Sequence, residues 1–218
     1  SVAQSGPAGY LLRDPGMPLD NLSNTLTIFL GANVACAQCH DHPLADWTQR
    51  EYFELAAFFG ATDVSDRDPR KVGNKLRNEQ LSKQDVIQAV APNLARVRTK
   101  SHQTLRFPDD YAYDDVKPGS RVEPLLFIWE SGDEKGPAYA VDHQNPKNLR
   151  ASFAQWLTHE KNPRFAATIA NRLWQRSFGL GVQEPLEDLD DLSKSANPAL
   201  LQLLGQVMRR RQCNSFFL

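Results

Sequence analysis

The 218-residue chain has only three cysteines and no apolar run near the roughly 20 residues that a membrane-spanning helix needs. Three cysteines exclude a framework of several disulfide bonds, and Cys213 is left unpaired if Cys36 and Cys39 act together. With 25 Lys and Arg against 26 Asp and Glu, the net charge of -1 provides no field for collecting nucleic acid. No P-loop, G-x-G-x-x-G or Ser-His-Asp arrangement occurs. We therefore predict no nucleic-acid partner and no membrane span in this chain, and its sequence assigns no reaction.

The composition is otherwise that of an ordinary globular protein, with 41% hydrophobic and 23% charged residues. Apolar periodicity predicts a mainly α fold, with helices expected over 20–31, 46–59 and 84–98. Short strands are expected at 104–107 and 122–129, on either side of a turn-rich region. A helical segment around the cysteines is thus expected to lead into a short β-containing connector.

The C-terminal third repeats one capping device. An Asn suited to the N-cap position precedes a Pro suited to the first helical position at Asn145, Asn162 and Asn197. Each of the three segments that follow carries apolar residues at helical spacing. We therefore predict a helical C-terminal module with a core of its own.

The most informative stretch is Cys36-Ala37-Gln38-Cys39-His40, which has the C-x-x-C-H spacing of covalent haem attachment. One turn of helix places both thiols on the same side, where they can form thioether bonds to haem vinyl groups. The imidazole that follows then lies under the macrocycle and ligates the iron. We therefore predict haem c as the cofactor, with Cys36 and Cys39 as attachment residues and His40 as the metal ligand.

Three other interpretations of this stretch stay open. A zinc ion could take Cys36, Cys39 and His42, although adjacent Cys39 and His40 rarely reach one tetrahedral ion and no second ligand pair follows. The cysteines could instead form a local disulfide outside the cytosol, or a thioredoxin-like dithiol, which normally follows a strand in a βαβ unit that we do not find here. In the last interpretation they are small buried thiols without chemistry.

A haem site would also need an apolar wall and a sixth iron ligand. Five residues could supply the wall or equally form an ordinary core between two helices: Leu44, Trp47, Phe53, Phe58 and Phe59. The candidates for the sixth ligand are Met17, Met208, His102, His143 and His159. His42 is too close to His40 to reach the opposite face of the same haem, and it is expected to cap a turn or to orient a neighbour through its second nitrogen.

The C-terminal module has its own candidate residues. Arg172, Trp174 and Arg176 could bind a sugar or a carboxylate by stacking and paired hydrogen bonds. The favoured interpretation is structural, with Arg172 in an ion pair with Glu184 or Asp188 and Trp174 in the core. The acidic residues of 187–191 lack the spacing of a calcium loop. The spacing of Glu184 and Asp188 does not support a role for them in hydrolysis.

Three groups of residues together resemble a known pair of domains. The first is DNLS at 20–23, FLG at 29–31, CAQCHDHP at 36–43 and WTQ at 47–49. The second is FPDDY at 107–111 and KPG at 117–119, and the third is AQWLT at 154–158, NPRFA at 162–166, NRLW at 171–174 and FGLG at 178–181. The first resembles the cytochrome-c-like domain of large exported planctomycete proteins. The second is similar to their linking segment, and the third to the start of the uncharacterised helical domain found with it.

This resemblance implies a division of the chain into the C-terminal part of the cytochrome-c-like domain at 1–62, a loop and short-strand connector at 63–144, and the N-terminal part of the uncharacterised domain at 145–218. It further implies an exported, periplasmic or cell-surface parent protein with several domains. The leading function is a c-type haem-binding, electron-transfer-like module whose partner is a redox protein or a neighbouring domain. The alternative is a non-catalytic extracytoplasmic binding or structural module, with a Cys36–Cys39 disulfide and a polysaccharide among its partners.

Overall fold

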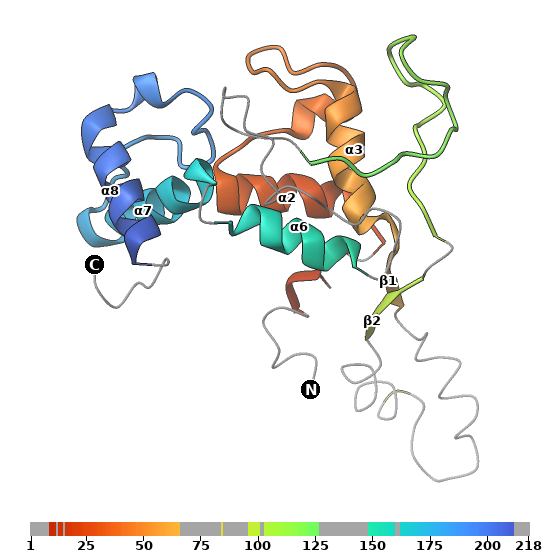
Figure 1. The fold of residues 1–218 in the computed structure, drawn as a ribbon, viewed down its shortest axis with the longest axis horizontal. Coiled ribbons are helices and arrows are strands. Elements are labelled where there is room, and N and C mark those ends of the chain that lie inside the picture. Colours follow the sequence, from red (N-terminus) through yellow and green to blue (C-terminus); the bar gives the residue numbers. More distant parts are fainter. Residues whose placement is uncertain are drawn as a thin grey trace.

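The computed structural model describes residues 9–11, 13–14, 16–65, 84, 96–100, 103–126, 148–159 and 162–211, and it is mainly helical, as predicted (Figure 1). Its α-helices are α2 (Pro18–Leu30), α3 (Gln49–Gly60), α6 (Leu149–Leu157), α7 (Pro163–Phe178) and α8 (Pro198–Arg210). Two short 3-10 helices are η2 (Ala35–Gln38) and η4 (Leu192–Lys194). Strands β1 (Thr62–Ser65) and β2 (Arg96–Thr99) form an antiparallel pair in which Thr62 faces Thr99.

Helix α3 is the centre of the fold. Every residue from Tyr52 to Gly60 is buried, so the helix is covered on all sides rather than on the single apolar face expected from its periodicity. Helix α2, helix α6 and the connector at 103–126 supply the cover, through side chains such as Leu26, Phe153 and Phe107. The connector approaches so closely that a Cβ on Gly60 would lie 2.8 Å from the Leu105 nitrogen.

The first two helices begin at other residues than predicted. Helix α2 starts at Pro18, with Met17 as its N-cap, because proline suits the first helical turn, and Asp20 lies inside that turn. Helix α3 starts at Gln49 rather than near Asp46. Thr48 caps it by accepting a hydrogen bond from the Glu51 nitrogen, while the Glu51 carboxylate accepts one from the Thr48 nitrogen. This capping box fixes the first turn three residues later than the apolar pattern indicates.

The predicted elements of the middle stretch need correction. Arg96–Thr99 forms β2 instead of the end of a helix over 84–98, because Val97 and Thr99 are β-branched residues in a pair with β1. Most of that predicted helix, Pro92 included, lies outside the described residues. Residues 104–107 form no strand but contribute one bridge, between Arg106 and Arg121. The described part of 122–129 has no strand either, since Pro124 has no N–H to donate.

Two of the three predicted Asn-Pro starts are confirmed. The Asn162 side chain accepts hydrogen bonds from the nitrogens of Arg164 and Phe165 at the start of α7. Asn197 accepts one from the Leu200 nitrogen at the start of α8. Helix α6 begins at Leu149, and the predicted cap Asn145 lies outside the described residues.

Three hydrophobic clusters form among the described residues, one large core and two smaller clusters. The larger core combines α2, η2 and α3 with the connector and with α6, including its fully buried Trp156. Helices α7 and α8 enclose smaller clusters around Leu201 and Met208 and lie at the opposite end of the molecule from the connector (Figure 1). Residues 1–62, 63–144 and 145–218 as separate domains remain a prediction.

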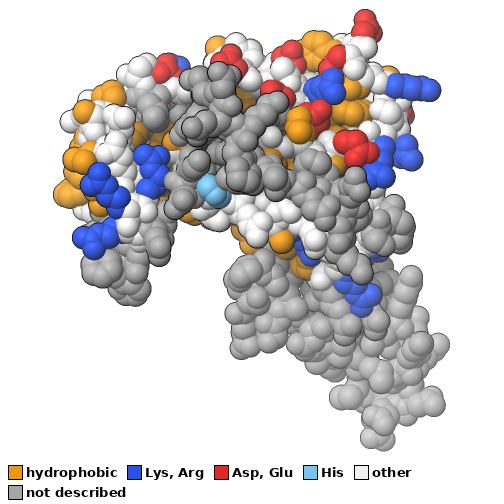
Figure 2. All heavy atoms as spheres, in the orientation of Figure 1, with side chains coloured by type: hydrophobic (Ala, Val, Ile, Leu, Met, Phe, Trp, Pro, Cys, Tyr) orange, Lys and Arg blue, Asp and Glu red, His pale blue; other side chains and the backbone are white. Residues whose placement is uncertain are grey.

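Charge of both signs is spread over the surface, in agreement with the net charge of the chain (Figure 2). Acidic side chains lie along the upper edge in this view, and basic ones lie at both ends. Among the helices of the described residues, none combines the length and apolar character needed to span a bilayer.

Candidate functional site

The cysteine motif lies on a short surface turn between α2 and α3. Helix α2 ends at Leu30, and Gly31 caps it in the left-handed conformation at φ 57°. The chain then forms η2, which contains Cys36, while Cys39 is its C-cap. A 3-10 helix has three residues per turn, so positions i and i+3 lie on the same side. Cys36 and Cys39 are therefore adjacent on one face, and both are exposed free thiols.

The ring of His40 has a defined orientation and tautomer. Its Nδ1 lies 2.7 Å from the Asp41 carbonyl oxygen, which can only accept a hydrogen bond. Nδ1 must therefore carry the proton, and in the neutral ring the lone pair is on Nε2. This is the arrangement by which a ligating histidine presents Nε2 to a metal while a carbonyl holds its other nitrogen. His40 itself is exposed.

Gln49, the first residue of α3, holds the turn from the inside. It is only 1% exposed. Its Nε2 donates to the Gln38 carbonyl oxygen at 3.2 Å, and its Oε1 accepts from the Ala112 nitrogen at 3.0 Å. Its backbone nitrogen donates to the Asp41 carboxylate at 2.8 Å. One buried residue thus joins η2, the loop after it and the connector.

The connector also holds the turn directly. The Asp41 nitrogen donates to the Tyr113 hydroxyl at 2.8 Å. Tyr113 packs edge-on against buried Tyr111, whose ring in turn packs against Phe107. Burial, with the nearby Asp115 carboxylate as a further cause, raises the pKa of the Tyr111 hydroxyl. No local pattern predicts this contact between residues 41 and 113, because it depends on the path of the connector.

The donor set therefore fits covalent haem, but the foreseen wall does not surround it. Trp47, Phe53, Phe58 and Phe59 are all buried in the larger core, and the last two pack against Phe153. Leu44 alone is exposed, at 88%, on the loop after His40. That loop is closed by a hydrogen bond from the His42 nitrogen to the Trp47 carbonyl oxygen, and the Leu44 nitrogen donates to His42 Nδ1. His42 thus orients its own loop, as predicted.

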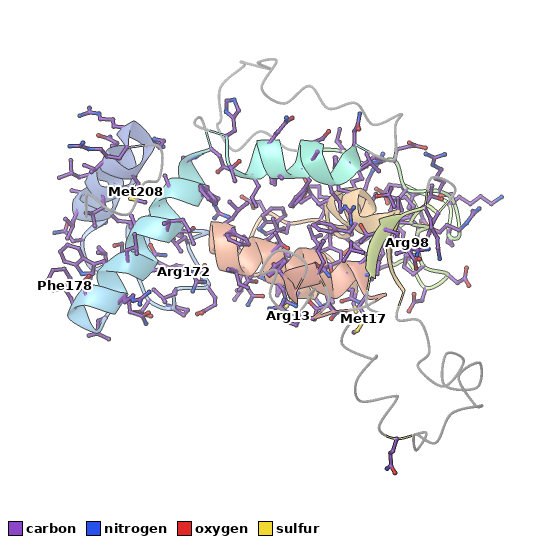
Figure 3. All side chains as sticks on the ribbon, turned by 90° about the horizontal axis from the view of Figure 1, so that it is seen from below. Arg13, Met17, Arg98, Arg172, Phe178 and Met208 are labelled. Atoms are coloured by element: carbon purple, nitrogen blue, oxygen red, sulfur yellow. The ribbon has the colours of Figure 1, made fainter. Side chains whose placement is uncertain are left out.

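The candidates for the sixth iron ligand differ in their exposure to solvent. Met208 is fully buried against Ala166 and Ala170, so it is a core residue. Met17 is 50% exposed at the start of α2 (Figure 3). His159 follows the C-terminus of α6, and His102 and His143 lie outside the described residues, as does Cys213.

The zinc interpretation gains no support from the geometry. Within the part of the chain that the structure describes, no three His, Cys, Asp or Glu side chains are grouped so that they could hold a metal ion. The acidic run at 187–191 likewise forms no group of metal ligands among the described residues. Asp191 accepts hydrogen bonds from Ser193, and Asp188 accepts one from the Asp190 nitrogen.

Two family models match this chain. Residues 16–64 match PSCyt2, a protein of unknown function (DUF1549), and residues 149–215 match PSD1, a protein of unknown function (DUF1553). Both families are typical of planctomycete proteins. No curated protein and no solved structure matches significantly. The PSCyt2 segment contains the cysteine motif, α2 and α3, whereas the PSD1 segment contains α6, α7 and α8.

The PSD1 segment binds the end of α2 through Arg172. Its Nε donates to the Ile28 carbonyl oxygen at 3.0 Å, and its Nη2 donates to that of Thr27 at 3.2 Å. These are among the last four carbonyls of α2, which have no partner within the helix and carry its partial negative charge. The side chain lies between α7 and α2 in Figure 3. The expected ion pair of Arg172 with Glu184 or Asp188 is therefore wrong.

The other residues predicted in the PSD1 segment are structural or exposed. The Glu184 carboxylate accepts a hydrogen bond from the Gly181 nitrogen at 2.6 Å. Trp174 packs against the cluster around Leu201, as favoured, and its ring lies 4.3 Å from that of the exposed Phe178. Arg176 is exposed on the last turn of α7. Because Arg172 is occupied by main-chain carbonyls, it is not free to bind a sugar or a carboxylate together with Trp174.

Proposed function

We propose that this chain carries a covalently attached haem c and acts as an electron-transfer-like module of an exported protein with several domains. Cys36 and Cys39 would form the two thioether bonds, and His40 Nε2 would ligate the iron. Haem would supply a one-electron couple, exchanged with a redox protein or with a neighbouring domain of the same parent.

The observation that carries this proposal is the donor set on one turn. Two free thiols share one face of η2, and the next residue is an exposed imidazole whose Nδ1–H is held by a carbonyl. The rigid turn would present all three groups in a single orientation, which is what a two-point attachment and an axial ligand require together.

The surroundings of the turn indicate how such a site would behave. Its aromatic neighbours are buried in the core, so much of the macrocycle would face water or a partner. Solvent exposure lowers the reduction potential of haem iron because water stabilises the more highly charged ferric state. We expect a lower midpoint potential than that of a cytochrome with an enclosed haem.

The deciding experiment expresses the chain with an export signal in a host that has cytochrome c maturation, followed by a reduced pyridine haemochrome spectrum. We expect a c-type band with one haem per chain. Cys36→Ala and Cys39→Ala should each reduce covalent haem, whereas His40→Ala should leave it attached with altered coordination. Cys213→Ala is the matched control and should match the wild type.

The alternative is a non-catalytic binding or structural module. The exposure of both thiols on one turn also suits a Cys36–Cys39 disulfide outside the cytosol. A colourless protein whose mass is two hydrogens short of the reduced chain would favour it. Haem that stays covalently bound after loss of both cysteines would contradict the haem proposal itself.

A further inference from the structure

We propose that Gln49, assisted by Tyr113, is the positioning residue of the cysteine turn, so that the site is complete only with the connector. This inference rests on the proposed function for its meaning, because it concerns how Cys36, Cys39 and His40 are presented. Ala112 and Tyr113 lie outside the 16–64 segment that matches PSCyt2. The matched segment therefore contains the donors and Gln49, but not the connector groups to which Gln49 and Asp41 bond.

Gln49 restrains the turn through its two amide atoms. Nε2 donates to the carbonyl oxygen of Gln38, the last residue of η2 and the one directly before Cys39. Oε1 accepts a hydrogen bond from the Ala112 nitrogen. A buried amide is suited to this bridge because it donates at one end and accepts at the other. With the side chain 1% exposed, water cannot replace either bond at low cost.

Tyr113 restrains the residue that orients His40. Its hydroxyl accepts a hydrogen bond from the Asp41 nitrogen, and the Asp41 carbonyl accepts the one from His40 Nδ1. The Asp41 carboxylate is bound in addition by the Gln49 nitrogen. The connector therefore sets the position of Asp41, and Asp41 sets the ring of His40.

The test is Gln49→Glu, compared with Gln183→Glu. Glutamate keeps the shape of the side chain and can still accept from Ala112, but its oxygens repel the Gln38 carbonyl. Gln183 is a matched control, since it is 3% exposed and its Nε2 donates to the carbonyls of Asp188 and Asp191, far from the cysteines in the sequence. Both variants should lower the melting temperature.

Amide hydrogen exchange in the haem-free chain separates positioning from general destabilisation. The nitrogens of Cys39 and His40 donate to the Cys36 carbonyl, so they report on the turn itself. Gln49→Glu should speed their exchange about tenfold, the loss expected for one buried hydrogen bond. Gln183→Glu should leave it unchanged at a matched margin below the melting temperature. Equal effects of the two variants, or none from Gln49→Glu, would overturn the proposal.

Two further measurements complete the test, one that does not depend on the folding of Gln49→Glu and one in the haem-loaded protein. Tyr113→Phe removes one acceptor from a 38%-exposed ring, and it should speed exchange of the Asp41 nitrogen even if Gln49→Glu does not fold. In haem-loaded protein, Gln49→Glu should raise the fraction of chains with a single thioether. If the wild type takes up no haem, the proposed function fails, while the exchange comparison still decides the role of Gln49.

Discussion

Tyr52 connects the central helix to the start of the chain's first long helix. Its hydroxyl donates to the Leu19 carbonyl oxygen and accepts a hydrogen bond from the Ser23 hydroxyl, each at 2.9 Å. The side chain is fully buried, and this burial raises its pKa to about 12, although the Ser23 hydrogen bond acts in the opposite direction. The folded state therefore favours the neutral form of the Tyr52 side chain.

The stability of the protein should therefore fall in alkali. The pKa of Tyr52 is higher in the folded than in the unfolded chain, so its contribution is complete below pH 10 and is lost as pH rises toward 12. The loss attributable to this residue is about 2 kcal/mol at pH 12. Urea unfolding at pH 9 and pH 12 measures it, and Tyr52→Phe should show a smaller decrease than the wild type. An identical decrease in both proteins would contradict this assignment.

Residues of the candidate site differ in how far their sequence predicts them. Cys36, Cys39 and His40 form a local pattern, and the structure places all three on one exposed turn. No sequence pattern predicts the role of Gln49, because its side-chain partners are main-chain atoms 11 and 63 positions away. Arg172 carries a charge that suggested an acidic partner, but its true partners are carbonyls 144 and 145 positions away.

At the scale of elements, α3 depends on its N-terminal capping box. Thr48 and Glu51 satisfy two backbone nitrogens of the first turn, directly beside Gln49. Thr48→Ala should reduce the free energy of unfolding by about 1 kcal/mol, the usual cost of losing such a cap. Urea denaturation measures the change. Thr158→Ala is the control, because this exposed hydroxyl donates to the Ala154 carbonyl of its own helix, and a loss as large there would argue against the capping effect.

Local capping signals explain which elements are predictable. Asn162 and Asn197 cap their helices as their sequence indicates, since the side chain, the proline and the first turn are neighbours. Apolar spacing alone places the start of α3 too early, because the Thr48–Glu51 capping box determines where the helix begins. Local sequence does not predict strand β2, because its partner β1 lies more than thirty residues earlier and pairing at that distance leaves little local signal.

At the scale of the whole molecule, the PSCyt2 and PSD1 segments meet where α6 packs against α3 in the larger core, and again at the C-terminus of α2. The Leu189 nitrogen donates to the Gly31 carbonyl oxygen at 2.7 Å, and Arg164 holds the same loop through the Leu189 carbonyl and Asp190. The rings of Phe29 and Phe165 stack beside this contact. None of these contacts is local in the sequence, so no local pattern predicts this junction.

This junction predicts that two glycines with the same backbone conformation differ in importance. Gly31 and Gly179 both have positive φ, at 57° and 87°, so alanine is strained at either position. A Cβ at Gly179 would meet nothing within 4 Å, whereas one at Gly31 would overlap the Leu189 side chain. Gly179→Ala should cost about 1–2 kcal/mol of unfolding free energy from strain alone.

Gly31→Ala should cost about 3 kcal/mol or more, because displacement of Leu189 adds the penalty of overpacking to the same strain. Urea unfolding followed by circular dichroism measures both variants. Near-ultraviolet signals from Trp174 should change in Gly31→Ala under native conditions, since Trp174 packs in the same cluster as Leu189. Equal losses in the two variants would mean that the Leu189 loop yields freely, and that α2 and the PSD1 segment are only loosely joined.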